Sequence, residues 1–188
     1  MMYIDDNNDY FPHRGNTGSN IPIWDSLVLL YTSSDRSIDN VAAGIFHCPS
    51  DKLKRSSIYT APRSYAINSG RSWSDERFRG IADATPQSLK FNTIPNPTGM
   101  LVLGERVPTT GCLIGANSGQ NISASTSAST PTNLQIAYRH DSGNKRTNMY
   151  FADGHVAYVN YYSKEIIGSH AAATYAAPLG VFTFWGED

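Results

Sequence analysis

The clearest pattern of hydrophobic and polar positions along the chain lies between residues 138 and 162. Two segments rich in aromatic and β-branched residues flank Asp153-Gly154, an arrangement that predicts a β-hairpin. Asp and Gly both tolerate the positive φ of a type I′ turn, and this turn would place Phe151 opposite Val156. Alternation then assigns Met149, Phe151, Val156 and Tyr158 to the core face, and Tyr150, Ala152, His155, Ala157 and Val159 to a half-exposed face.

Hydrophobic periodicity predicts a short helix near the start of the chain and several further strands. The helix would begin near Pro22, and its apolar stripe consists of Trp24, Leu27, Val28 and Tyr31. The expected strands or extended segments are residues 45–51, 59–70, 100–107, 111–115, 134–139 and 179–185. Residues 71–99 are expected to be irregular, and residues 75–79 and 163–167 to form single helical turns.

The Ser/Thr-rich residues 116–133 predict a long exposed loop, because they cannot bury enough apolar surface to offset their ordering entropy. A length of 188 residues is typical of one domain, so residues 1–188 are expected to fold as a single unit. The predicted fold class is α+β, with a central antiparallel β-sheet, short helices and long loops.

Composition narrows the class of protein. Charged residues make up 16%, against roughly a quarter in an average soluble protein, and this favours an extracytoplasmic β-rich protein. The net charge is −1 and no run of Lys or Arg occurs, so no nucleic-acid partner is expected. No apolar run approaches the roughly 20 residues of a membrane-spanning helix.

The chain has two cysteines, Cys48 and Cys112, and their spacing leaves two readings open. They are separate buried thiols, or they form a disulfide whose loop would contribute about 4 kcal/mol in the chain-entropy model. His47 precedes Cys48, but neighbours in an extended segment point to opposite faces and do not easily share one metal ion.

No catalytic motif is present, and we expect no catalytic residues and no enzyme activity. His140, Asp153 and His155 could converge, because the hairpin returns the chain towards residue 140, and such a set could serve a metal-dependent hydrolase. The favoured alternative is structural: His140 braces the loop before the hairpin, and Asp153 binds amides of the turn.

Two further sites carry acidic side chains. Asp5, Asn7 and Asp9 have the spacing that begins a calcium loop, but the expected Gly and distal Glu are missing, so a solvated turn is favoured. Glu105 is a charge inside an apolar strand, and we expect it to pair with an arginine.

An ordered set of short segments resembles a bacterial family of prepilin-like proteins that carry a C-terminal H-X9-DG domain. Members are similar to type II secretion pseudopilins of the type IV pilin superfamily. The segments are residues 6–12, 21–31, 46–51, 64–68, 101–105 and 139–159, the last of which includes His140 and Asp153-Gly154-His155. Twelve residues separate His140 from Asp153 instead of the family's nine, so the loop before the hairpin is longer.

The resemblance implies a pilin-like fold from which the long N-terminal apolar helix and its leader have been removed. It implies an extracytoplasmic structural subunit, anchored in the inner membrane in its precursor form, with no cofactor. Its partners would be a prepilin peptidase, acting on the leader, and other pilin-like subunits, packing through the helix. An alternative function is a carbohydrate- or peptide-binding module, because eleven Tyr and three Trp suit a surface that stacks on such ligands.

Overall fold

The computed structural model describes residues 2–15, 22–32, 45–53, 62–69, 81–82, 88–107, 121–122, 137–140, 143 and 146–160. The helices are α1 (Met2–Asp6), α2 (Trp24–Thr32) and the 3₁₀ helix η3 (Phe91–Thr93). The strands are β1 (Tyr65–Asn68), β2 (Leu101–Glu105), β3 (Asn121–Ile122), β4 (Arg146–Phe151) and β5 (Val156–Asn160). Within these residues no helix is long and apolar enough to span a bilayer.

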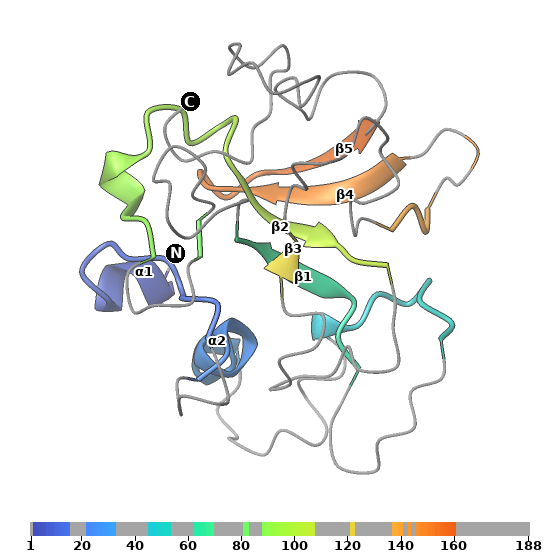
Figure 1. Ribbon diagram of the computed structural model, residues 1–188, viewed down its shortest axis with the longest axis horizontal. Helices are drawn as coiled ribbons and strands as arrows, with labels where there is room; N and C mark the ends of the chain where they lie inside the picture. The colour runs from blue at the N-terminus through green and yellow to red at the C-terminus, as the bar shows by residue number, and fades with distance from the viewer. Residues whose placement is uncertain are drawn as a thin grey trace, which may run out of the picture.

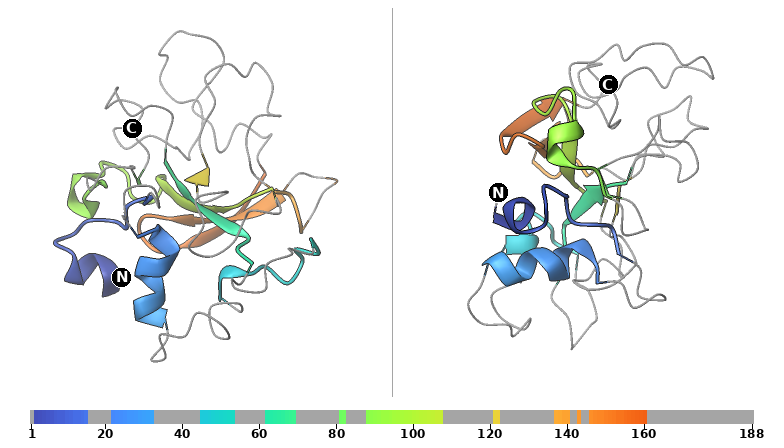
Figure 2. Two further views of the ribbon diagram at one scale, coloured as in Figure 1. Left: turned by 60° about the horizontal axis from the view of Figure 1, so that its bottom comes forward. Right: turned by 90° about the vertical axis from the view of Figure 1, so that its left-hand side faces the viewer.

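The strands form one sheet in the order β3-β1-β2-β4-β5 (Figure 1). The β1–β2, β2–β4 and β4–β5 pairs are antiparallel, whereas β3 pairs in parallel with β1. Helices α1 and α2 lie beside each other on one side of the sheet (Figures 1 and 2). This arrangement agrees with the predicted α+β class and its central antiparallel sheet.

The described hydrophobic core lies between the two helices and the sheet. Its buried members include Ile4, Phe11, Ile23, Trp24, Leu29, Phe46, Ile67, Met100 and Val102. A buried ion pair joins Asp25 of α2 to Arg63, which precedes β1, and neither side chain is exposed. The guanidinium of Arg63 also lies 5.9 Å from the ring centre of Trp24. The helix predicted from the apolar stripe therefore packs on the sheet through both apolar contacts and a buried charge pair.

The hairpin of β4 and β5 is present, but its predicted register is wrong by one residue. Tyr150 pairs with Val156, and Phe151 donates its N–H to the carbonyl of His155. The loop has three residues, and only Gly154 among them has a positive φ, of 97°. It is a type I turn followed by a glycine bulge, an alternative to the two-residue type I′ turn.

The change of register exchanges the two faces of β5, because side chains alternate along a strand. Val156 and Tyr158, assigned to the core from the sequence, are exposed by 63% and 44%, whereas Val159 is buried. Met149 and Phe151 are buried, as predicted.

Several other expectations can be compared with the described residues. The helix near Pro22 and the strands within residues 59–70 and 100–107 are confirmed. The extended segment expected at residues 45–51 is wrong, because Ile45 and Phe46 are helical and a turn closed by Cys48 and Asp51 follows. Residues 137–139 are not a strand, although Ala137 donates one hydrogen bond to the carbonyl of Glu105. Within the predicted exposed loop, Asn121–Ile122 form β3. The elements expected at residues 75–79, 111–115, 163–167 and 179–185 lie outside the described residues.

Candidate functional site

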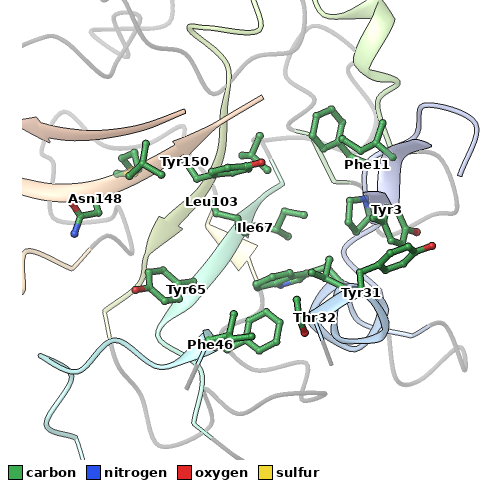
Figure 3. Close-up of a pocket in the computed structure, with 18 residues that line it drawn as sticks. Tyr3, Phe11, Tyr31, Thr32, Phe46, Tyr65, Ile67, Leu103, Asn148 and Tyr150 are labelled. Carbon is green, nitrogen blue, oxygen red and sulfur yellow. The ribbon is translucent and has the colours of Figure 1, made fainter. Parts of the chain in front are cut away.

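A pocket of about 730 Å³ lies between α1, α2 and the sheet (Figure 3). Aromatic and aliphatic side chains dominate its wall, and Asn148 and Thr32 add polar groups. The aromatic residues that line it are Tyr3, Phe11, Trp24, Tyr31, Phe46, Tyr65 and Tyr150. A concave, largely apolar space with a few polar groups is typical of a binding site.

A bulge in β2 helps to shape the floor of this pocket. The register between β2 and β4 shifts between Leu101 and Leu103, so one extra residue of β2 opposes Tyr150. Val102 and Leu103 therefore both line the pocket, although they are consecutive in the strand. Figure 3 shows Leu103 and Tyr150 close together on this floor.

Tyr3 on α1 and Tyr31 on α2 hold the two helices together at the pocket wall. Their rings meet edge to face, with centroids 5.5 Å apart. Asn7 donates from its side-chain amide to the carbonyl of Tyr3 at 2.7 Å and to the hydroxyl of Tyr31 at 3.3 Å. The short helix α1 is thus tied to α2 by ring packing and hydrogen bonds.

A second candidate site is a polar cluster around Glu105, at the end of β2. The Nε2 atom of His140 lies 2.8 Å from Oε1 of Glu105 and 3.6 Å from Sγ of Cys48. Asn148 donates to the same Oε1 at 3.1 Å. Glu105 and Cys48 are buried, whereas 30% of the His140 side chain is exposed. The sulfur, nitrogen and carboxylate oxygen all lie within 4.8 Å of one another.

Arg139 connects this cluster to a second buried carboxylate. Its guanidinium lies 3.6 Å from Oε2 of Glu105 and 3.2 Å from Oδ2 of Asp51. It also donates to the backbone carbonyl of Arg106, and Ser64 donates to Asp51 at 2.7 Å. The cluster therefore joins the residues around Cys48, the start of β1, the end of β2 and the segment before β4.

Tyr65 lies where the polar cluster meets the pocket. Burial raises the pKa of Tyr65 to about 12, with further contributions from Cys48 and Glu105. Its hydroxyl therefore stays protonated at neutral pH and serves as a hydrogen-bond donor beside the cysteine.

The hairpin turn holds Asp153 and His155 as a local pair. The backbone N–H of His155 donates to Oδ1 of Asp153 at 3.1 Å, and Nδ1 of its ring lies 2.6 Å from the same oxygen. These hydrogen bonds, led by the backbone one, lower the pKa of Asp153. The ring of His155 stacks on Phe151 at 4.4 Å between centroids. Asp153 thus binds an amide of the turn, as the structural interpretation predicted.

The structure does not unite His140, Asp153 and His155 as one metal-ligating group. His140 contacts Cys48 and Glu105 instead, while Asp153 and His155 form their own pair at the turn. Among the residues that the structure describes, one group of three has its ligand atoms close enough for a metal ion, and it consists of Cys48, Glu105 and His140.

The residues proposed for calcium fall at the end of α1. Asp5 lies within the helix and is exposed, and Asn7 uses its amide in the tyrosine contacts described above. Asn8 and Asp9 have φ values of 54° and 67°, which end the helix in a left-handed turn. Asn92 donates to the carboxylate of Asp9 at 3.3 Å. Calcium binding by this segment stays a prediction.

The sequence analysis singled out Cys48, Glu105 and His140 but did not predict that they lie together. Cys48 and His140 are 92 residues apart, and Glu105 and His140 are 35 apart, so no short spacing motif relates them. The useful signal was the lone charge of Glu105 in an apolar strand, because a buried carboxylate requires partners. Cys48 carries a free thiol.

Comparisons with protein-family models, curated proteins and solved structures find no match for this chain.

Proposed function

We propose that this chain is the globular part of a pseudopilin-like subunit that acts in assembly and catalyses no reaction. The subunit is extracytoplasmic, and a long apolar helix that precedes α1 anchors its precursor in the inner membrane. After cleavage by a prepilin peptidase, that helix packs against other subunits. The ordered family-like segments described above support this proposal, together with the α+β architecture.

The single observation that carries the proposal is the apolar pocket beside α1. A concave, largely apolar surface of this kind can receive the apolar face of a helix. The pocket lies between α1 and the sheet, and Tyr3 and Ile4 of α1 line it. A helix that continues upstream from α1 could therefore pack against the apolar residues of the pocket. In the proposed subunit, the C-terminal part of that helix covers the pocket.

A charge placed in the pocket tests this role. Val28 is half-buried on α2 and lines the pocket, so Val28→Asp should keep the fold but impair helix packing. We expect the complete gene product carrying Val28→Asp to be processed, but cross-linked into oligomers at least about tenfold less, equivalent to roughly 1.4 kcal/mol. Cross-linking in membranes, with circular dichroism of the domain, measures both properties.

Val107→Asp is the matched control, because Val107 is 45% exposed and does not line the pocket. Equal cross-linking of the two variants would contradict the role of the pocket. A complete gene product without a peptidase-cleaved leader would contradict the whole proposal.

A second candidate function is binding of a carbohydrate or peptide, favoured by the aromatic wall of the pocket. Aromatic rings provide large apolar contacts, and tyrosine hydroxyls add hydrogen bonds to such ligands. Saturable binding of a glycan by the isolated domain, weakened by Val28→Asp but not by Val107→Asp, would favour this function over assembly.

A further inference from the structure

We propose that Cys48, Glu105 and His140 form a binding site for a divalent transition-metal ion, for which Zn²⁺ fits best. A thiolate, an imidazole and a carboxylate are the three ligand types that zinc uses in proteins. The proposal concerns residues away from the hairpin turn, and it does not depend on the assembly function.

The separations between the ligand atoms suit a tetrahedral ion. With Zn–S of about 2.3 Å and Zn–N and Zn–O of about 2.1 Å, tetrahedral angles give sulfur–nitrogen and nitrogen–oxygen separations of about 3.6 Å and 3.4 Å. The observed Sγ–Nε2 distance is 3.6 Å, close to the first value. The Nε2–Oε1 distance of 2.8 Å is that of a hydrogen bond, so His140 and Glu105 must separate by roughly half an ångström on binding.

The contacts of His140 argue for a metal site over a nucleophilic triad. In a cysteine–histidine–carboxylate triad, one ring nitrogen faces the nucleophile and the other faces the carboxylate. Here the same atom, Nε2, faces both Sγ of Cys48 and Oε1 of Glu105. Three potential ligand atoms thus converge on one region of space, as they do around an ion.

The charges of the cluster suit a dication. A thiolate and a carboxylate neutralise Zn²⁺, and the neighbouring Asp51–Arg139 pair adds no net charge. Glu105 is fully buried, so a cation beside its carboxylate would offset the cost of removing that charge from water. Its Oε2 atom faces the guanidinium of Arg139 at 3.6 Å, so Oε1, which lies beside His140, is the oxygen that would bind the ion.

Groups around the three ligands can hold them in place. Asn148 donates to Oε1 of Glu105 at 3.1 Å and so fixes the position of that oxygen. Such outer hydrogen bonds orient ligands and tune affinity in known metal sites. The partly exposed His140 leaves a path for the ion and room for a water molecule as fourth ligand.

Zinc binding to the full 188-residue chain, purified with a chelator and then dialysed, tests the proposal. Calorimetry should show one ion per chain, and zinc should raise the melting temperature, because it binds the folded state. His140→Gln should weaken binding by more than about 100-fold, since even loss of an outer partner costs about 10–100-fold. Asn148→Ala should weaken binding by about tenfold.

Two matched controls keep the test specific. His155→Gln removes an exposed histidine from the hairpin turn and should leave zinc affinity unchanged. With Co²⁺ as the probe, thiolate-to-cobalt absorption should appear in the wild type and in Cys112→Ser, and should be lost in Cys48→Ser. His140→Gln changes a partly exposed side chain, so its test stands even if the buried Cys48→Ser variant does not fold.

Three results would overturn the proposal. The first is the absence of a single zinc ion per chain in calorimetry of the wild type. The second is wild-type affinity in folded His140→Gln. The third is cobalt–thiolate absorption that depends on Cys112 and not on Cys48.

Discussion

Individual charged residues in this protein are stabilised in two different ways. Glu105 and Asp25 are buried, and their partners Arg139 and Arg63 come from distant parts of the chain. Asp153 is exposed, and its partner is a residue two positions away. A buried carboxylate without partners would cost several kcal/mol, so tertiary structure must supply them, whereas a turn aspartate needs only local backbone amides.

Asp153 should contribute stability that depends on pH. Its pKa is lower in the folded protein than the ordinary value of 3.8, so the folded state favours the carboxylate. The stabilisation is complete above the unfolded-state pKa and is lost as pH falls through the folded-state pKa. We therefore expect Asp153→Ala to lower the melting temperature at pH 6, and the difference from the wild type to shrink below about pH 4.

Thermal melts between pH 6 and pH 2 measure this effect. Asp6→Ala removes a charge from an exposed position on α1 and serves as the control. A constant difference between wild type and Asp153→Ala across the whole range would contradict the role of the ionised carboxylate.

At the scale of elements, single extra residues decide which side chains face the core. The three-residue hairpin loop exposes Val156 and buries Val159. The bulge in β2 turns two consecutive residues, Val102 and Leu103, towards the pocket. The loop and the bulge each add one residue to an otherwise regular strand pairing. Beyond the added residue, the side chains that would have faced one side of the sheet face the other.

Gly154 should be required by the backbone of the hairpin loop. Its φ of 97° is unfavourable for a residue with a Cβ, so Gly154→Ala should destabilise the fold by about 1–3 kcal/mol. Gly154→Asn should cost less, because asparagine tolerates positive φ better than alanine. Urea denaturation measures both variants, and an alanine variant as stable as the asparagine variant would argue against a left-handed position.

The sequence was sufficient for the hairpin's existence but not for its register. Asp-Gly fits a type I′ turn, and it also fits the last two positions of a three-residue loop with a glycine bulge. Burial of Val159 and exposure of Val156 distinguish the two, and burial depends on the rest of the sheet. The helix near Pro22 and the strand at residues 100–107 were predictable because each carries a strong local pattern.

The candidate sites depend more heavily on tertiary structure. The sequence identifies Glu105 as an isolated charge and His140 as part of a family-like motif, but their contact links residues from separate segments. The pocket likewise combines α1, α2 and strands from both halves of the chain. The spacing of residues along the chain does not reveal contacts between distant segments. Neither site could therefore be located from the sequence.

At the scale of the whole molecule, the network around Arg139 connects four segments beside one end of the pocket. Asp51 follows the Cys48 turn, Ser64 precedes β1, Glu105 ends β2, and Arg139 precedes β4. The ligands of the proposed metal site come from three of these segments. Stability and metal affinity are therefore expected to depend on the same long-range contacts.

Loss of Arg139 should reveal how strongly this network stabilises the fold. Its side chain is 7% exposed, and both carboxylates that it contacts are fully buried. Arg139→Ala leaves these carboxylates without the guanidinium, so we expect the free energy of unfolding to fall by about 3–5 kcal/mol. Urea denaturation in the presence of a chelator measures this loss without compensation by a bound metal.

Lys52→Ala is the control, because exposed Lys52 donates only to the nearby carbonyl of Pro49 among the contacts described. Its loss should cost less than about 0.5 kcal/mol. If Arg139→Ala is as stable as Lys52→Ala, the buried charges are not what joins the four segments, and packing around the pocket must do so instead.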